Sequence, residues 1–205
     1  MNNIAIILGS TRPHRNGEAV AKWVYEIARK RSDAAFELID IKDYNLPLLD
    51  EPIPASQGKY SKEHTKKWAA KINSFDAYVF VTPEYNHSMP GALKNAIDFL
   101  YKEWNNKAAG FVSYGSAGGT RAVEHLRLVM GELMVADVRA QVMLSLATDF
   151  VNYSEFKPDP RHVQEVNTLL EQVIAWGNAL KTLRGETISA KNGSNGKAIS
   201  EFVNK

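Results

Sequence analysis

The sequence predicts an α/β fold: a doubly wound, five-stranded parallel sheet with helices on both faces. Short β-rich runs alternate five times with longer runs that have the 3.6-residue period of helices. Several short runs, such as residues 4–8 and 78–81, are apolar at consecutive positions. Continuous apolar runs are expected of strands that helices cover on both sides, so both patterns lead to the same fold class.

This alternation assigns a range to each element. The expected strands are residues 3–9, 35–41, 76–82, 108–114 and 138–144. The expected helices are residues 16–31, 61–74, 90–104, 119–134 and 160–183. Residues 42–59 contain three prolines, and we expect a long irregular connection there, because the alternation resumes after it.

The length of 205 residues, 44% of them hydrophobic, fits one domain with a sizeable core, which we place at residues 1–184. Residues 185–205 are rich in Gly, Ser, Asn and Lys and hold few apolar side chains. Such a segment does not bury enough apolar surface to join a core. We therefore expect a polar, mobile tail.

Charge and composition make several classes of partner and chemistry unexpected. The 25 basic and 23 acidic residues leave a net charge of only +2, so neither nucleic acid nor a membrane surface is the expected partner. There is no cysteine, which removes disulfides and thiolate chemistry and fits a cytoplasmic protein. No apolar run is long enough to span a membrane, and no spacing typical of metal ligands is evident.

The loop after the first strand is unusual. It carries Ser10, Thr11, Arg12 and Arg15 and leads into a helix that starts near Asn16 and Gly17. Hydroxyls, free N–H groups at a helix start and arginine side chains all favour a bound phosphate. The alternative is a capped helix with solvated arginines, since Asn is a good N-cap residue. The position at a strand end favours phosphate, because open parallel sheets bind ligands at that edge.

The type of phosphate compound follows by elimination. A Walker loop requires Gly-Lys-Ser/Thr at its end, which is absent, and residues 9–14 do not match the dinucleotide fingerprint G-x-G-x-x-G. A single phosphate at the first loop of a five-stranded sheet is the arrangement that holds flavin mononucleotide (FMN) in the flavodoxin-like strand order 2-1-3-4-5. The sequence therefore predicts this flavodoxin-like order.

Three stretches carry a family resemblance. They are GSTR at residues 9–12 with Arg15, PEYN at 83–86 followed by PGALKNAID at 90–98, and SYGSAGG at 113–119 with Arg121. In these stretches, and in the order of elements over about the first 180 residues, the sequence resembles the NADPH-dependent FMN reductase family. Members are flavodoxin-like reductases of flavins, quinones, azo dyes and chromate.

The resemblance implies a set of FMN contacts. The phosphate would be held by Ser10, Thr11, Arg12, Arg15, Asn16 and Gly17. The flavin ring would be lined by Pro83, Glu84, Tyr85 and Asn86, and its other edge by Tyr114, Gly115 and Gly118. For Glu84, a solvated carboxylate is an equal alternative, and residues 115–119 read alternatively as a flexible turn.

The resemblance also implies the chemistry. Hydride would pass from NADPH or NADH to flavin N5 and onward to a small acceptor: a quinone, an azo compound, free flavin or chromate. No side chain is assigned as catalytic, because the cofactor makes and breaks the bonds. Two alternatives stay open: a flavodoxin-type electron carrier, which the net charge of +2 disfavours, and a non-catalytic flavin-binding regulator.

Two helices predict self-association. Phe99 and Tyr101 lie off the apolar stripe of the helix expected at 90–104, and apolar residues cover most of the helix expected at 119–134. A surface helix of a monomer keeps a polar side. We therefore expect a homodimer, or a dimer of dimers, unless residues 42–59 or the tail cover this surface.

Overall fold

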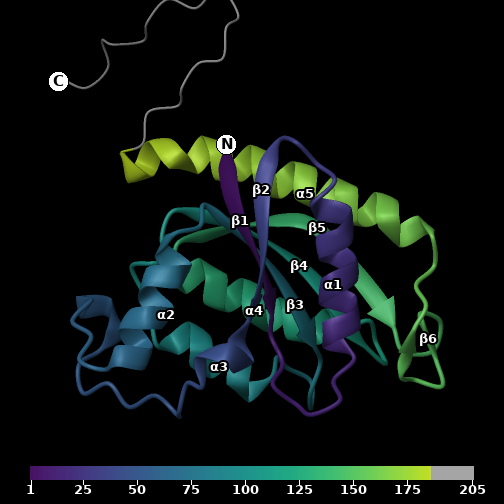
Figure 1. The fold of residues 1–205 in the computed structure, drawn as a ribbon, viewed down its shortest axis with the longest axis horizontal. Coiled ribbons are helices and arrows are strands. Elements are labelled where there is room, and N and C mark those ends of the chain that lie inside the picture. The colour runs from purple at the N-terminus through teal and green to yellow at the C-terminus, as the bar shows by residue number, and fades with distance from the viewer. Residues whose placement is uncertain (186–205) are drawn as a thin grey trace, which may run out of the picture.

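The computed structural model describes residues 1–185, so the tail expected at 185–205 lies outside the described residues except for Gly185. Five parallel strands form one sheet in the order β2-β1-β3-β4-β5 (Figure 1), and the predicted flavodoxin-like order is confirmed. The strands are β1 (Asn2–Leu8), β2 (Ala34–Asp40), β3 (Ala77–Pro83), β4 (Lys107–Gly115) and β5 (Val135–Ser145). A two-stranded hairpin, β6 (Phe150–Val151) and β7 (Glu155–Phe156), follows β5 and was not predicted.

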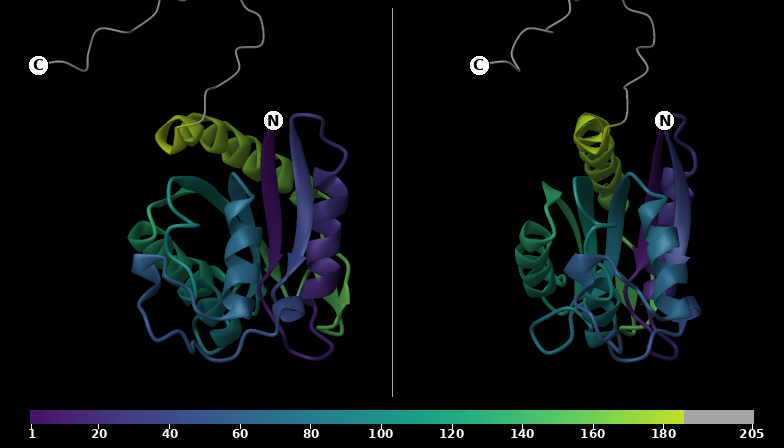
Figure 2. Two further views of the ribbon diagram at one scale, coloured as in Figure 1. Left: turned by 60° about the vertical axis from the view of Figure 1, so that its left-hand side comes forward. Right: turned by 90° about the vertical axis from the view of Figure 1, so that its left-hand side faces the viewer.

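Helices cover both faces of the sheet, as Figure 2 shows from two sides. One face carries α1 (Gly17–Ala28) and α5 (Arg161–Leu180), and the other carries α2 (Glu63–Asn73), α3 (Gly91–Asp98) and α4 (Thr120–Glu132). Short 3-10 helices lie at η1 (Ile41–Tyr44), η2 (Ala55–Gln57) and η3 (Lys181–Arg184). The irregular connection expected at 42–59 contains part of η1 and all of η2.

The double burial of the strands explains their continuous apolar runs. In β1, Ile4 and Ile6 face the core under α1 and α5, while Ala5 and Ile7 face the core under α2, α3 and α4. All four are fully buried. Successive side chains of a strand point to opposite faces, so a strand between two helical layers needs apolar residues at every position.

The helix expected at 90–104 ends at Asp98, six residues early. Phe99, Leu100 and Trp104 remain buried, but they pack from turns rather than from a helix. The position of Phe99 off the helical stripe therefore reflects the helix end and not a second apolar face. This removes one of the two reasons for expecting a dimer; the other, α4, keeps Leu128 with 77% of its surface exposed.

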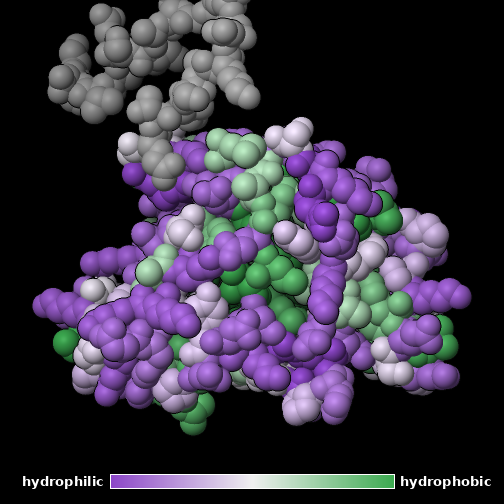
Figure 3. All heavy atoms as spheres, in the orientation of Figure 1, coloured by the Kyte–Doolittle hydropathy of each residue, from purple (hydrophilic) through white to green (hydrophobic). Residues whose placement is uncertain are grey.

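The surface drawn in Figure 3 is mostly polar. Apolar side chains gather in the middle of this view, at the edge of the sheet formed by β2, and polar side chains frame them. In β2, the half-buried Phe36 and Leu38 pack against the core under α1 and α5. The opposite edge strand, β5, carries a bulge: Ala109 and Phe111 of β4 pair with Asp137 and Gln141, which are four residues apart.

Gly110 lies at this bulge beneath α5, and a β-carbon there would lie 2.8 Å from Val173 Cγ2 and 3.0 Å from Leu169 Cδ2. We predict that Gly110→Ala lowers the free energy of unfolding by about 1–3 kcal/mol through overpacking. The matched control is Gly131→Ala in α4, where no atom lies within 4 Å of the added carbon. It should stabilise by about 0.5–1 kcal/mol. Urea unfolding of both variants measures the difference, and equal effects would contradict this packing.

Candidate functional site

A cavity of about 170 Å³ lies where the loops after β1, β3, β4 and β5 meet. Its lining residues are Arg12, Arg15, Asn16, Pro83, Glu84, Tyr85, Tyr114, Gly115 and Leu146. We call it the site cavity. Eight of the nine were predicted as cofactor contacts from the sequence, so the fold brings most of that set to one place. The carboxyl edge of the sheet is where open α/β folds bind ligands.

Beneath the site cavity, a contact between two hydroxyls joins neighbouring loops; Ser10, predicted as a phosphate contact, does not itself line the cavity. Ser10 is fully buried, and its Oγ lies 3.0 Å from the Tyr85 hydroxyl. The Arg12 N–H donates weakly to the same Oγ at 3.4 Å. The guanidinium of Arg12 lies 5.9 Å from the centre of the Tyr85 ring, a cation–π contact. The loop after β1 and the loop after β3 are thus joined through Ser10 and Tyr85.

Arg15, predicted as a phosphate contact with a solvated loop arginine as the alternative, is a buried residue. Its side chain is only 2% exposed, and it forms ion pairs with Asp40 at the end of β2 and with Glu18 in α1. Its Nη1 donates to the Ser10 carbonyl. Two carboxylates already neutralise the charge of Arg15. Its main role is therefore to fix the conformation of the loop after β1. Asp40 was not predicted, although an acidic residue at the end of a neighbouring strand is the signal that identifies such a partner.

The start of α1 lacks a side-chain cap. The side chain of Asn16 makes no capping hydrogen bond and instead donates from Nδ2 to the carbonyl of Tyr153 at 2.9 Å. This outcome excludes the Asn-capped helix considered from the sequence. The first N–H groups of an uncapped helix carry partial positive charge and bind anions readily.

The hydroxyl of Tyr114 faces this helix start. It is buried and has no hydrogen-bond partner within the described part of the chain. A β-carbon at Gly17 would lie 2.6 Å from it, so glycine permits the close approach. Burial, together with nearby Tyr85, raises the pKa of Tyr114, which stays a neutral hydroxyl at physiological pH. A buried hydroxyl without a partner is costly, and a phosphate oxygen beside α1 would satisfy it.

Glu84 is not solvated, so the alternative reading of this residue was wrong. Its side chain is 5% exposed and pairs with the Arg121 guanidinium, and its Oε2 accepts the Arg121 N–H at 3.0 Å. Burial raises the pKa of Glu84, but hydrogen bonds from Arg121 and Ala122 outweigh that effect, and the pKa lies below its usual value. The carboxylate therefore caps α4, while the rest of the residue lines the site cavity.

Some predicted contacts do not line the site cavity. Thr11 lines a neighbouring cavity of about 230 Å³ beside Lys42 and Asn95. Asn86 is exposed at the tip of a turn and has a φ of 48°, and Gly118 has a φ of 64° beneath Met143. Leu146, which does line the site cavity, was missed, because a leucine after a strand carries no recognisable signal.

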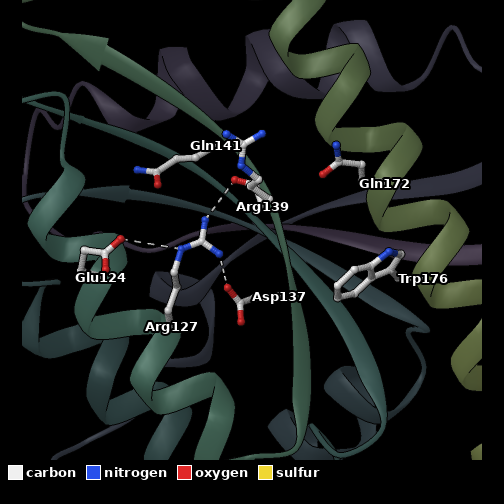
Figure 4. A pocket seen from close by; sticks show the side chains of 7 residues that line it. All are labelled: Glu124, Arg127, Asp137, Arg139, Gln141, Gln172 and Trp176. Carbon is white, nitrogen blue, oxygen red and sulfur yellow. Dashed lines mark hydrogen bonds and ion pairs between the residues drawn. The ribbon is translucent and has the colours of Figure 1, made fainter.

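A larger cavity, of about 780 Å³, lies elsewhere, on the outer side of β5 between α4 and α5 (Figure 4). There Arg127 donates to the Val138 carbonyl at 2.9 Å, and Gln172 Oε1 accepts the Ala140 N–H at 3.1 Å. These side chains occupy hydrogen-bonding groups that an edge strand otherwise leaves open to another strand. The groove is therefore explained as protection of the sheet edge.

Comparison with known proteins identifies the family. Residues 2–149 match the family model described as NADPH-dependent FMN reductase. The chain belongs to this family. The FMN-dependent NAD(P)H oxidoreductase predicted from the sequence is thereby confirmed. Over the described residues, no helix is both long and apolar enough to cross a membrane.

Similar sequences and a solved structure are consistent with this family assignment. An NAD(P)H-dependent FMN reductase of Nectria sp. is 42% identical over 159 residues, 73% of this chain and 79% of that protein. One from Schizosaccharomyces pombe is 40% identical over 148 residues, 71% of this chain and 74% of the relative. The flavoenzyme NAD(P)H:(acceptor) oxidoreductase FerB of Paracoccus denitrificans superposes with a TM-score of 0.69 at 21% identity, covering 87% of this chain and 98% of its own, a similarity of fold.

The capping of α4 by Glu84 can be tested by substitution. We predict that Glu84→Gln lowers the free energy of unfolding at pH 7 by about 1–3 kcal/mol, because a buried charged acceptor is lost. The folded-state pKa is lowered, so the contribution is complete above the ordinary glutamate pKa of about 4.3 and is lost as pH falls through the lowered value. Wild type and variant should converge in acid.

Urea unfolding across this pH range measures the effect. The control is Glu124→Gln, whose side chain is 73% exposed and 3.9 Å from Arg127, and which should change stability by less than about 0.5 kcal/mol. A Glu84→Gln protein as stable as wild type at pH 7 would show that the carboxylate does not cap α4.

Proposed function

We propose that the site cavity holds FMN with its phosphate at the start of α1, and that the enzyme reduces a quinone-class acceptor. The observation that carries this proposal is the buried, unpartnered Tyr114 hydroxyl facing an uncapped helix start. Both groups can donate a hydrogen bond to an oxygen, the helix start favours a negatively charged one, and a phosphate supplies several. Relatives named quinone reductase, including one of Pseudomonas putida that is 36% identical over 132 residues, favour a quinone acceptor.

The chain's own residues bind and orient the cofactor. Arg12 is exposed beside the site cavity and has room to meet the phosphate, whereas Arg15 keeps the loop in place through Asp40 and Glu18. Pro83, Glu84 and Tyr85 on one side and Gly115 on the other form the walls nearest the ring. Gly115 adds no side chain, so the backbone approaches the ring closely.

When bound, FMN would supply the redox chemistry that links NAD(P)H to the acceptor. Orientation is then the protein's main contribution, and it comes from a cavity formed by strand ends and the loops that follow them. Within the described residues, the His, Asp and Glu side chains form no group of three that could hold a metal ion.

A direct assay separates the enzyme from a flavodoxin-type carrier and from a non-catalytic flavin-binding regulator. Purified protein loaded with FMN should oxidise NADPH or NADH rapidly when benzoquinone is added, with no protein partner present. Bound flavin without turnover would support the regulator and overturn the quinone proposal. Turnover that requires a partner protein would support the carrier.

Removal of the Tyr114 hydroxyl should leave stability unchanged or raised but lower the affinity for FMN. Tyr114→Phe removes an unsatisfied buried group, so the protein without FMN should be as stable as wild type or more stable by up to about 1 kcal/mol. Its affinity for FMN should fall by about five- to tenfold, because one phosphate hydrogen bond is lost. Flavin fluorescence quenching measures the affinity.

The control for this variant is Tyr153→Phe, whose side chain is 69% exposed and should change neither value. Unchanged FMN affinity in Tyr114→Phe would place the phosphate elsewhere.

We also propose that the protein forms a homodimer through α4, and that residues 1–184 act as one cytoplasmic reductase domain. An open, partly apolar cavity of about 520 Å³ lies beside Leu128, Val129 and Leu133, and neighbouring Leu100 and Tyr101 extend it. Pro54 and Ala55 of the 42–59 connection reach its margin but leave Leu128 exposed. An exposed apolar face of this kind is typical of a protein contact.

Sedimentation tests this contact. The wild type should sediment at twice the chain mass of 22.9 kDa at micromolar concentration, and Leu128→Glu should shift it to the monomer by burying a charge at the interface. Leu183→Glu is the control, because Leu183 is also exposed, at 63%, but lies in η3. A monomeric, fully active wild type would rule out the dimer.

A further inference from the structure

The segment between β5 and α5 forms one wall of the site cavity. Leu146 lines the cavity, and its N–H donates to the Gly115 carbonyl at 3.1 Å. Farther along, the buried Phe150 ring lies 6.1 Å from the ring of Tyr114 and 5.1 Å from that of Phe156. The hairpin β6–β7 therefore braces the side of Tyr114, whose hydroxyl faces α1.

The same segment reaches the phosphate end of the cavity. The Tyr153 carbonyl, at the hairpin turn, accepts the Asn16 side-chain hydrogen bond at 2.9 Å. This bond turns the amide of Asn16 toward the hairpin, and the Asn16 side chain makes no capping bond to α1. Docking of the hairpin thus leaves the first amides of α1 open and holds Tyr114 beside them.

Asp149 organises this segment from within. It is 1% exposed, and its carboxylate accepts the Ser145 N–H at 2.8 Å and the Asp159 N–H at 3.1 Å. Thr148 Oγ1 donates to it at 3.1 Å. Burial raises the pKa of Asp149, but these hydrogen bonds and His162 outweigh it and lower the pKa below the usual value. The carboxylate ties both ends of the hairpin segment together.

His162 connects this carboxylate to α5. Its side chain is 2% exposed; Nε2 lies 3.1 Å from Asp149 Oδ1, and Nδ1 lies 2.7 Å from Glu165 Oε2. Helix α5 is itself fixed to the sheet through buried Val166, Leu169 and Leu170. The His162–Asp149 contact therefore fixes the short β6–β7 hairpin relative to α5.

We propose that His162 and Asp149 are positioning residues for FMN: their buried contact latches the β6–β7 hairpin against Tyr114 and Asn16. This inference rests on the proposed placement of FMN in the site cavity. In the described part of the chain, every hydrogen bond recorded for the Asp149 side chain falls within residues 145–162. Loss of the latch should therefore loosen this segment and leave the sheet intact.

The test compares His162→Gln with Glu165→Gln. Glu165 bonds the same imidazole but is 43% exposed and belongs to α5, so its loss leaves the hairpin contact in place. In protein without FMN, hydrogen exchange of residues 147–157 should be about tenfold faster in His162→Gln, whereas amides of β1 and β3 stay as in wild type. Glu165→Gln should match wild type throughout.

FMN binding, followed by fluorescence quenching, is the second readout. The dissociation constant should rise about tenfold in His162→Gln, while kcat at saturating FMN stays within about twofold, because the ring walls after β3 and β4 are unchanged. If His162→Gln does not fold, Phe156→Leu is the second variant. It removes the ring contact of Phe156 with Phe150 in the hairpin and should shift both readouts in the same direction.

Wild-type exchange and FMN affinity in His162→Gln would overturn the latch. Faster exchange spread over the whole sheet, with a parallel loss of FMN, would overturn it as well, because it shows general destabilisation. A wild type that fails to bind FMN would instead overturn the proposed function, whereas the exchange data would still report on the hairpin.

Discussion

The close packing of Tyr114 against Gly17 is the contact on which the rest of the site depends. A β-carbon at Gly17 would lie 2.6 Å from the tyrosine hydroxyl, so the end of β4 and the start of α1 meet only because this position is glycine. The contact places a buried donor beside the open amides of a helix. It also fixes the distance between the loop after β1, which carries the charges, and the loop after β4, which carries the glycines.

Charge in this region is divided between two arginines with different surroundings. Arg15 lies under the loop between two carboxylates, which together compensate its buried charge. Arg12 lies outside, against the Tyr85 ring. One guanidinium therefore maintains the shape of the loop, and the other is available to a ligand. Glu84 also has two roles, since its carboxylate caps α4 and the residue lines the site cavity.

The sheet order and the location of the site followed from the sequence, because both depend on patterns that local chemistry sets. Continuous apolar runs marked strands buried on both faces, and hydroxyls, arginines and glycines gathered at strand ends. The pairing of Arg15 with Asp40 and of Glu84 with the start of α4 did not follow, because each joins segments far apart in the chain. The early end of α3 was missed because Phe99, Leu100 and Trp104 are buried whether they belong to a helix or to turns.

A comparison of FMN with riboflavin tests the placement of the phosphate most directly, because the two differ only in that group. If the phosphate lies between α1, Arg12 and Tyr114, FMN should bind at least about 100-fold more tightly than riboflavin, since two charge-assisted contacts contribute about 1.5 kcal/mol each. Fluorescence titration of the wild-type protein with each flavin gives the ratio. Equal affinities for the two flavins would contradict a phosphate site at the start of α1.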